Sequence, residues 1–208
     1  MKKKLVKKEN DDFPRKMNRK DDNPIDTILY DIADLLSPFF KKLNFTPNMF
    51  TTLSFLTGLL SAYYYYLKKY NFTAIFYILS YWFDTIDGHF ARKYNMQTRF
   101  GDYYDHVTDV LVNVMFLFLF YKNQDMPFIY KKYFFIFAII ITRWTSYHFN
   151  CVEKKNHPDP RFIKSDTLNF MCRGMCNDNL NLTSFFNAGT LIMYITIYIL
   201  LHKNFNNI

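Results

Sequence analysis

The sequence predicts an all-α integral membrane protein, a bundle of five or six transmembrane helices preceded by an amphipathic juxtamembrane helix. Its composition is the first observation, since 50% of the 208 residues are hydrophobic and 21% are aromatic, with only five Gly and seven Pro. Charged and apolar residues also occupy separate stretches, so the mean hydropathy of −0.15 describes neither kind of stretch. Finally, several uncharged stretches approach the length of about 20 residues that a helix needs to cross a bilayer.

The N-terminal part of the chain divides into a polar arm and an amphipathic helix. Residues 1–24 are almost entirely polar and lack the apolar segment of a secretory signal peptide, so we expect a disordered cytoplasmic arm. Residues 25–42 then place apolar side chains at helical spacing, with Asp26 and Asp34 on the opposite side. This pattern is typical of a helix on a membrane surface, with an ordinary surface helix as the alternative. Pro38 is expected to end or kink this helix.

Five apolar stretches follow, and two of them contain acidic residues. Tyr residues at the ends of these stretches are typical of the aromatic belt of a membrane protein. We expect membrane-spanning helices at residues 48–67, 72–92, 100–121, 133–152 and 182–202. Together with the preceding helix they make residues 25–208 one transmembrane domain. A water-soluble bundle with long core helices is the alternative, which uncharged runs of this length disfavour.

The distribution of Lys and Arg predicts the orientation. With a cytoplasmic N-terminus and alternating spans, 19 of the 26 Lys and Arg residues lie inside and six lie outside. This asymmetry follows the positive-inside rule, so the net charge of +8 is mainly a topology signal. The N-terminal bases alternate with acids and form no single basic face, so no nucleic-acid partner is expected.

Two pairs of acidic residues lie within the second and third expected spans. Asp84 and Asp87 are three residues apart, and Asp105 and Asp109 are four apart, so each pair shares one helical face. If the helices fold back on each other at the polar stretch 94–97, the two pairs face each other at matching depths. Acids at membrane depth are costly, and they indicate a functional site.

Such a cluster of carboxylates has to bind either protons or cations. Oxygen ligands favour a hard divalent ion, Mg²⁺ or Mn²⁺, and two such ions would suit the clamping of a phosphoryl group. Gly88, Ala91 and Gly101 continue the acidic faces and leave room there for a ligand. Arg92 is placed to take a phosphate with its planar guanidinium.

The segment from Asp84 to Asp109 resembles the signature of the CDP-alcohol phosphatidyltransferase family, D-x2-D-G-x2-A-R-x8-G-x3-D-x3-D, and matches it without a gap. The stretch TPNMFTTL at 46–53 is similar to the family's Pro-Asn-x-x-Thr pattern at the first span. The resemblance implies an enzyme of phospholipid biosynthesis. It would transfer a phosphatidyl or phosphoalcohol group from a CDP-alcohol, such as CDP-diacylglycerol, to a small alcohol acceptor and release CMP.

The resemblance also implies roles for individual residues. Asp84, Asp87, Asp105 and Asp109 would hold the metal, and Asp109 would in addition act as general base on the incoming hydroxyl. The residues that the resemblance places around the CDP-alcohol donor are Asn48, Thr51, Gly88, Ala91, Arg92, Thr98 and Gly101.

Other features leave alternatives open. Arg143, inside the fourth expected span, either snorkels to the cytoplasmic edge or binds a phosphate of the acceptor. Arg161 and Lys164 are further candidates for acceptor binding, with a solvated loop as the alternative. His89 and His106 adjoin the acids at variable motif positions and are expected to be bystanders or indirect contacts. Family members have six spans and tend to form homodimers through them, so the five spans read here leave the homodimer interface open.

Three other functions compete with the leading hypothesis. An intramembrane prenyltransferase also uses Asp-rich helices with Mg²⁺, but the Gly-x2-Ala-Arg segment argues against it. A cation transporter would use the acids to line a path and would release no CMP. A degenerate family member that acts only as a partner is disfavoured by the intact motif. The sequence leaves the identity of the donor and of the acceptor alcohol open.

Overall fold

The computed structural model describes residue 15, residues 22–122, the positions 129, 132, 133, 135–137, 139, 140 and 144, and residues 188–205. Its secondary structure in these parts is helical, without strands, which confirms the all-α prediction. The helices are α1 (Pro24–Lys42), α2 (Pro47–Tyr66), α3 (Tyr70–Lys93), α4 (Arg99–Lys122) and α8 (Ala188–Phe205). Among the described residues, no helix reaches both the length and the apolarity needed to cross a membrane.

The helices begin at residues suited to helix N-termini. The Asn23 side chain accepts hydrogen bonds from the backbone N–H groups of Ile25 and Asp26, at 2.7 and 3.4 Å, and so caps α1. Proline occupies the first position of α1 and of α2, where its missing N–H has no helical partner to lose. The Thr98 hydroxyl caps α4 by accepting the Gly101 N–H at 3.0 Å.

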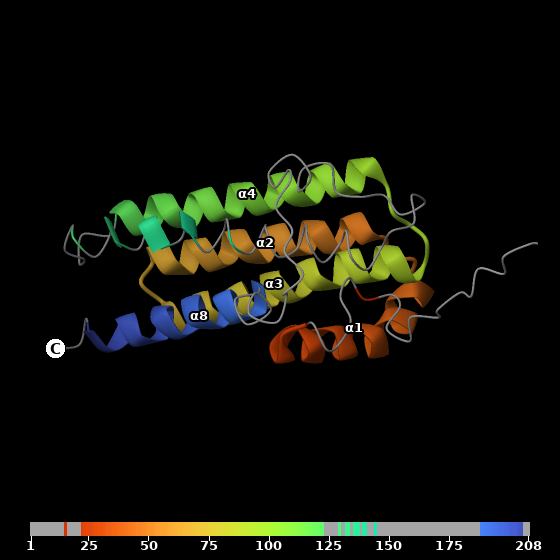
Figure 1. Cartoon of the computed structure of the whole chain (residues 1–208), viewed down its shortest axis with the longest axis horizontal. Helices are drawn as coiled ribbons and strands as arrows, with labels where there is room; N and C mark the ends of the chain where they lie inside the picture. Colours follow the sequence, from red (N-terminus) through yellow and green to blue (C-terminus); the bar gives the residue numbers. More distant parts are fainter. Residues whose placement is uncertain are drawn as a thin grey trace, which may run out of the picture.

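Three helices end in the same kind of tight turn. Asn44, Lys68 and Asn95 follow α1, α2 and α3, and their φ angles are 58°, 57° and 54°. After each of them, the next backbone N–H reaches back to a carbonyl five residues earlier, as in a Schellman motif. These short connections turn the chain back on itself, so that α1 runs antiparallel to α2, α2 to α3 and α3 to α4 (Figure 1).

Helix α2 lies between α3 and α4 (Figure 1). Its contact with α3 includes small and hydroxyl-bearing residues, which allow the backbones to approach closely at these points. The Ser54 and Ser80 hydroxyls each donate to the other's backbone carbonyl at 2.9 Å. Ser61 donates to the Thr73 carbonyl at 2.7 Å, and Gly58 leaves space for a side chain of α4.

Helices α1 and α8 lie along different halves of α3 (Figure 1). The expectation that Pro38 ends or kinks α1 is wrong about the ending, because the helix continues to Lys42. Pro38 lacks the N–H that would bond to the Asp34 carbonyl four residues earlier. The Lys93 ammonium group of α3 donates to that carbonyl at 3.1 Å and replaces the missing bond.

The acid-bearing side of α1 faces the bundle. The sequence pattern places Asp26 and Asp34 opposite the apolar side chains and leaves open which side meets the protein, and the structure buries Asp26, Tyr30, Ala33 and Ser37 against the bundle. The apolar side chains that point outward are Ile28, Ile32, Leu35 and Phe39. The reason is that Asp26 and Asp34 find hydrogen-bond partners on α3, which offset the loss of hydration on burial.

A candidate divalent-metal centre in an interhelical pocket

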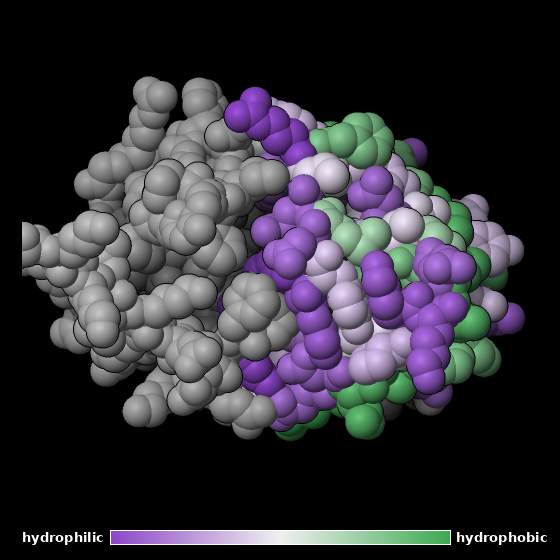
Figure 2. All heavy atoms as spheres, turned by 90° about the vertical axis from the view of Figure 1, so that its right-hand side faces the viewer, coloured by the Kyte–Doolittle hydropathy of each residue, from purple (hydrophilic) through white to green (hydrophobic). Residues whose placement is uncertain are grey.

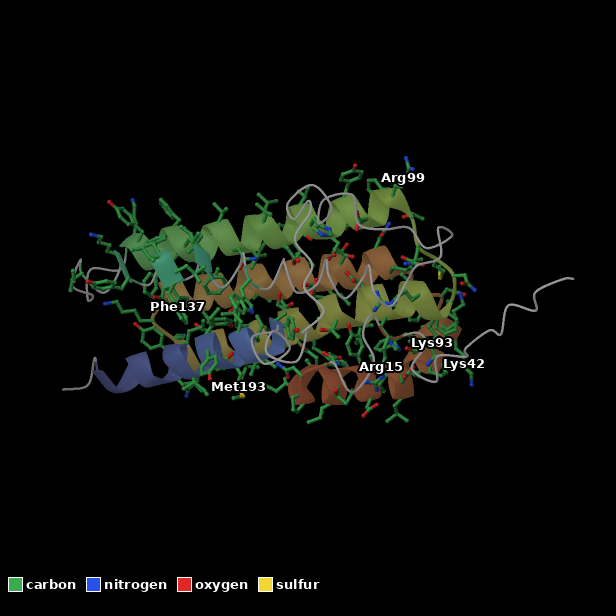
Figure 3. The ribbon with its side chains drawn as sticks, in the orientation of Figure 1. Arg15, Lys42, Lys93, Arg99, Phe137 and Met193 are labelled. Carbon is green, nitrogen blue, oxygen red and sulfur yellow. The ribbon has the colours of Figure 1, made fainter. Side chains whose placement is uncertain are left out.

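A pocket of about 840 Å³ lies among α2, α3, α4 and α8. Polar and small residues such as Asn48, Gln97 and Gly101 line one end of it, and apolar residues such as Phe120 and Ile199 line the other. The face of the molecule at the α3–α4 turn is rich in hydrophilic side chains (Figure 2). Lys42, Lys93 and Arg99 gather at the same end of the bundle, as Figure 3 shows.

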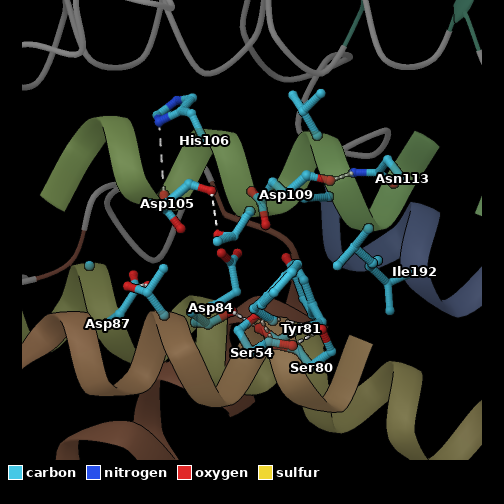
Figure 4. A pocket seen from close by; sticks show the side chains of 18 of the residues that line it. Ser54, Ser80, Tyr81, Asp84, Asp87, Asp105, His106, Asp109, Asn113 and Ile192 are labelled. Carbon is cyan, nitrogen blue, oxygen red and sulfur yellow. Dashed lines mark hydrogen bonds and ion pairs between the residues drawn. The ribbon is translucent and has the colours of Figure 1, made fainter. Parts of the chain in front are cut away.

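Three of the four predicted acids meet in this pocket (Figure 4). Asp84 projects from α3, and Asp105 and Asp109 project from α4, since the tight turn at Asn95 brings these helices back on each other. One carboxylate oxygen from each residue lies within 4.8 Å of the others. This group is the candidate metal centre of the described part of the chain.

Asp87 lines the same pocket but does not belong to this group of three. Its carboxylate accepts a hydrogen bond of 2.7 Å from the Thr51 hydroxyl of α2, and both side chains are buried. The resemblance places Thr51 at the donor, and the structure adds this direct bond to an acid of the motif. Reasoning from the sequence missed the bond, although the antiparallel pairing of α2 with α3 places Thr51 opposite the motif.

All seven residues expected around the donor line the pocket, namely Asn48, Thr51, Gly88, Ala91, Arg92, Thr98 and Gly101. A Cβ atom at Gly88 would come within 3.1 Å of an Arg92 guanidinium nitrogen, so the guanidinium lies close over this glycine. A Cβ atom at Gly101 would come within 3.2 Å of the Asn48 side-chain oxygen. Both glycines therefore allow polar groups to approach the helix backbone.

The candidate acceptor residues Arg143, Arg161 and Lys164 lie outside the described residues. The two histidines occupy different environments. His106 lines the pocket, and its Nδ1 hydrogen-bonds with the Asp102 backbone carbonyl at 2.7 Å. His89 is fully buried on the α1 side of α3, where its Nε2 lies 2.8 Å from an Asp34 carboxylate oxygen.

Sequence reasoning missed a junction of three helices beside the acids. The Tyr81 hydroxyl of α3 donates to the Asp26 carboxylate of α1 at 2.6 Å, and the Gly189 N–H of α8 donates to the other carboxylate oxygen at 3.4 Å. Burial raises the pKa of Asp26, while these two hydrogen bonds act in the opposite direction. Tyr81 also lines the pocket, three residues before Asp84. No local pattern connects residues so distant in sequence.

The donor set fits a hard divalent cation. Three carboxylates from two helices supply only oxygen ligands, which Mg²⁺ and Mn²⁺ prefer and which soft metals do not. Without a cation, carboxylates this close would repel one another in a half-buried pocket. The fold and the pocket thus define a helical protein with a carboxylate centre suited to binding a divalent cation.

Comparison with known proteins identifies the group to which this chain belongs. Residues 44–207 match the sequence model of the family described as CDP-alcohol phosphatidyltransferase. The chain belongs to this family, whose members transfer phosphoalcohol groups from CDP-alcohols, depend on divalent metal ions and are generally embedded in membranes.

The chain is also similar to a protein of Aquifex aeolicus (strain VF5) described as an uncharacterized protein. The two are 36% identical over 80 residues, which cover 36% of this chain and 40% of that protein. No solved structure matches this chain significantly.

Proposed function

We propose that the protein is a metal-dependent, integral-membrane enzyme of phospholipid biosynthesis. It transfers a phosphatidyl or phosphoalcohol group from a CDP-alcohol, such as CDP-diacylglycerol, to an alcohol acceptor and releases CMP. The observation that carries this proposal is the group of three carboxylates within 4.8 Å of one another, in the pocket that all seven expected donor residues line. Membership of the family supports the same reaction class.

Asp84, Asp105 and Asp109 are the residues that would hold Mg²⁺ or Mn²⁺, with Asp87 on the same wall of the pocket. A bound cation would neutralise negative charge on the phosphoryl oxygens. Arg92 binds a donor phosphate through its guanidinium, which lies over Gly88. These residues position the donor and balance its charge, which is most of what phosphoryl transfer requires.

The bond changes follow from these positions. The acceptor oxygen forms a bond to the phosphorus that carries the alcohol of the donor, and the bond between this phosphorus and the oxygen of CMP breaks. Asp109 takes the proton of the acceptor hydroxyl as general base. The CDP part of the donor lies toward the polar end of the pocket, where Asn48, Thr98 and Gly101 are grouped.

The location in a membrane is supported by the apolar side chains that the described helices expose. On α1 the exposed fractions of Ile28, Leu35 and Phe39 are 59%, 78% and 59%. An ordinary surface helix in water would bury such a stripe, so the outward apolar face favours a membrane surface. Helix α4 exposes a second large apolar face, formed by Val107, Val110, Leu111, Val114 and Phe118. We therefore place residues 25–208 in the membrane as one domain.

The orientation follows from the basic residues. Lys42, Lys93 and Arg99 lie at the end of the bundle that carries the polar end of the pocket (Figure 3). The positive-inside rule places this end, the N-terminal arm of residues 1–24 and the active site on the cytoplasmic side. Members of the family tend to form homodimers through their membrane helices, and we propose the same for this protein.

The direct test measures CMP release by purified protein in detergent or lipid, with Mg²⁺ or Mn²⁺, CDP-diacylglycerol or CDP-choline, and a panel of alcohols. Asp109→Asn should lower the rate by about 10³-fold, because general-base catalysis contributes about 10² to 10⁴. Asp31→Asn, on the outer part of α1, is the control and should retain the rate.

Undiminished CMP release by Asp109→Asn would contradict the role of Asp109. Absence of CMP with every donor would overturn the proposed function. Turnover of a prenyl diphosphate, or ion flux in vesicles, would then identify one of the competing functions.

A further inference from the structure

Helix α1 is attached to α3 by two side-chain contacts in register. Tyr81 contacts Asp26, and His89 contacts Asp34, and the two residues of each pair are 55 positions apart in sequence. Because the separation is the same, the two helices run parallel without a shift over about two helical turns. A displacement of α1 by one turn along α3 would break both contacts.

The second contact involves more than one hydrogen bond. The Lys93 ammonium group donates to the Asp34 carboxylate at 2.7 Å and to the Asp34 backbone carbonyl at 3.1 Å. That carbonyl is available because Pro38 supplies no helical N–H. Asp34 therefore receives hydrogen bonds from two residues of α3, on its side chain and on its backbone.

The first contact extends to a third helix. The Gly189 N–H lies in the first turn of α8, where backbone donors have no helical partner and the helix dipole favours a negative charge. A Cβ atom at position 189 would overlap the Asp26 carboxylate, so the contact requires glycine. Asp26 thus ties α1, α3 and the start of α8 together.

These contacts lie on the α1 side of α3. At 100° per residue, His89 and Lys93 project roughly opposite Asp84 and Asp87, and Tyr81 projects between the two sides, so that it reaches Asp26 and also lines the pocket. Among the described residues, α3 and α4 make few direct contacts, because the pocket lies between them. The distance from Asp84 to the acids of α4 therefore depends on the other neighbours of α3, which are α2, α8 and α1.

We propose that Asp26 and Tyr81 are positioning residues, through which the docked α1 and α8 fix the rotation and axial position of α3 so that Asp84 meets Asp105 and Asp109 in a geometry that binds a divalent cation. Neither residue belongs to the acid cluster itself. This inference rests on the proposed function to the extent that the cluster is taken as a metal site.

The test titrates purified protein with Mn²⁺ and follows binding by electron paramagnetic resonance, a readout that requires no turnover. Asp26→Ala and Tyr81→Phe should each weaken Mn²⁺ binding about tenfold, the lower end of the effect of partners beyond the ligands. Tyr63→Phe is the matched control, because Tyr63 is 56% exposed on α2 and lies outside the pocket lining. Its affinity for Mn²⁺ should stay within twofold of the wild-type value.

Further variants separate positioning from loss of fold. Asp26→Asn keeps an acceptor oxygen for Tyr81 and should bind Mn²⁺ more tightly than Asp26→Ala does. The double variant Asp26→Ala/Tyr81→Phe should be no weaker than Asp26→Ala, because the two residues act as one unit. In the CMP assay the Mn²⁺ concentration for half-activation should rise about tenfold, while kcat at saturating Mn²⁺ should change less than threefold. Partial unfolding would instead lower the number of Mn²⁺ sites at unchanged affinity.

Each outcome has a separate meaning. Equal Mn²⁺ affinity in the wild type, Asp26→Ala and Tyr81→Phe would overturn this inference and leave the proposed function intact. A wild type that binds Mn²⁺ but releases no CMP, with weakened binding in the variants, would support the inference and overturn the proposed function. A wild type that binds no Mn²⁺ would overturn both.

Discussion

Helices α3 and α4 have the same length of 24 residues and each contributes acids to the pocket, but they are held in different ways. Helix α3 is packed along most of its length, with Ile86, His89 and Phe90 almost completely buried. Helix α4 buries Thr108, Val112 and Phe120 and exposes much of its apolar surface. Among the described helices, the wall of the pocket formed by α3 is thus packed against several neighbours, and the wall formed by α4 is packed mainly against α2.

The difference shows that the acids of the cluster are positioned by two helices that are packed to different degrees. The position of Asp84 is set by packing on several sides of its helix. Among the helices that the structure describes, the positions of Asp105 and Asp109 depend mainly on the interface of α4 with α2. Substitutions in the core of α3 should therefore reduce stability strongly, whereas those on the outer face of α4 should have little effect on it.

The largest expected effect concerns the core of α3. Phe90 is fully buried in a cluster with Ala33, Phe50 and Ile86, so Phe90→Ala should lower the free energy of unfolding by about 3–5 kcal/mol. The control is Phe118→Ala on α4, where the side chain is 55% exposed, and its loss should stay below about 1 kcal/mol. Unfolding midpoints in the same detergent would measure both. Equal losses would contradict the distinction between the two walls.

The second prediction concerns the interface of α4 with α2. A Cβ atom at Gly58 would come within 2.9 Å of Val112 Cγ2, so Gly58→Ala should push α4 outward and cost about 1–3 kcal/mol of stability. Val112→Ala in the same chain should recover part of that loss, because it removes the overlapping methyl groups. Thermal unfolding of the two single variants and the double variant would measure the coupling. Additive losses of stability in the double variant would show that positions 58 and 112 do not interact.

A smaller gain is expected at the turn that leads into α3. Lys68 has a φ of 57°, a left-handed conformation that disfavours side chains by about 1 kcal/mol. Lys68→Gly should therefore raise the free energy of unfolding by up to about 1 kcal/mol. Lys69→Gly is the control, since its φ of −91° gives glycine no such advantage. A stability gain in both variants would point to the loss of charge instead.

The smallest expected effect is a dependence of stability on pH at the contact of α1 with α3. Burial would raise the pKa of Asp34, but hydrogen bonds from Lys93 and His89 outweigh it and hold this pKa below its ordinary value of about 3.9. The ionised form therefore stabilises the fold above about pH 4, and this contribution disappears as the pH falls through the lowered pKa.

The contribution should be below about 1 kcal/mol, because 37% of the Asp34 side chain is exposed and water screens the charges. Unfolding midpoints of the wild type and of Asp34→Asn, measured between pH 3 and pH 7, should differ at neutral pH and converge at low pH. A difference in midpoint that stays constant over this range would exclude a contribution of ionised Asp34 to stability.

The acid cluster and the helices α2, α3 and α4 could be predicted from the sequence because their signals are local. The spacing within each acid pair, Asp84 with Asp87 and Asp105 with Asp109, determines which helical face carries the acids. The polar turn between the two helices then brings these faces together. The helical bounds expected at 48–67, 72–92 and 100–121 lie within two residues of those of α2, α3 and α4, while their crossing of a membrane stays a prediction.

The arrangement of α1 could not be predicted, because an amphipathic pattern defines two faces without stating which of them meets the protein. The spacing places Asp26 opposite the apolar side chains of this helix, but it does not show that Tyr81 and the Gly189 N–H lie beside it. These partners lie 55 and 163 positions away in sequence, and only the tertiary packing brings them together. Thr51 lines the pocket with the acids, and its bond to Asp87 likewise depends on the packing of α2 against α3.

The turn between α1 and α2 is only four residues long, and this length has a thermodynamic consequence for α1. Because the connection is short, the effective concentration of α1 at its docking site on the bundle is in the millimolar range. Individually weak contacts then suffice to keep α1 docked, provided that the chain remains continuous. A protease site inserted in this turn would turn an intramolecular equilibrium into a bimolecular one. After cleavage, a free peptide of residues 22–43 would have to be supplied in millimolar excess to restore the bound state.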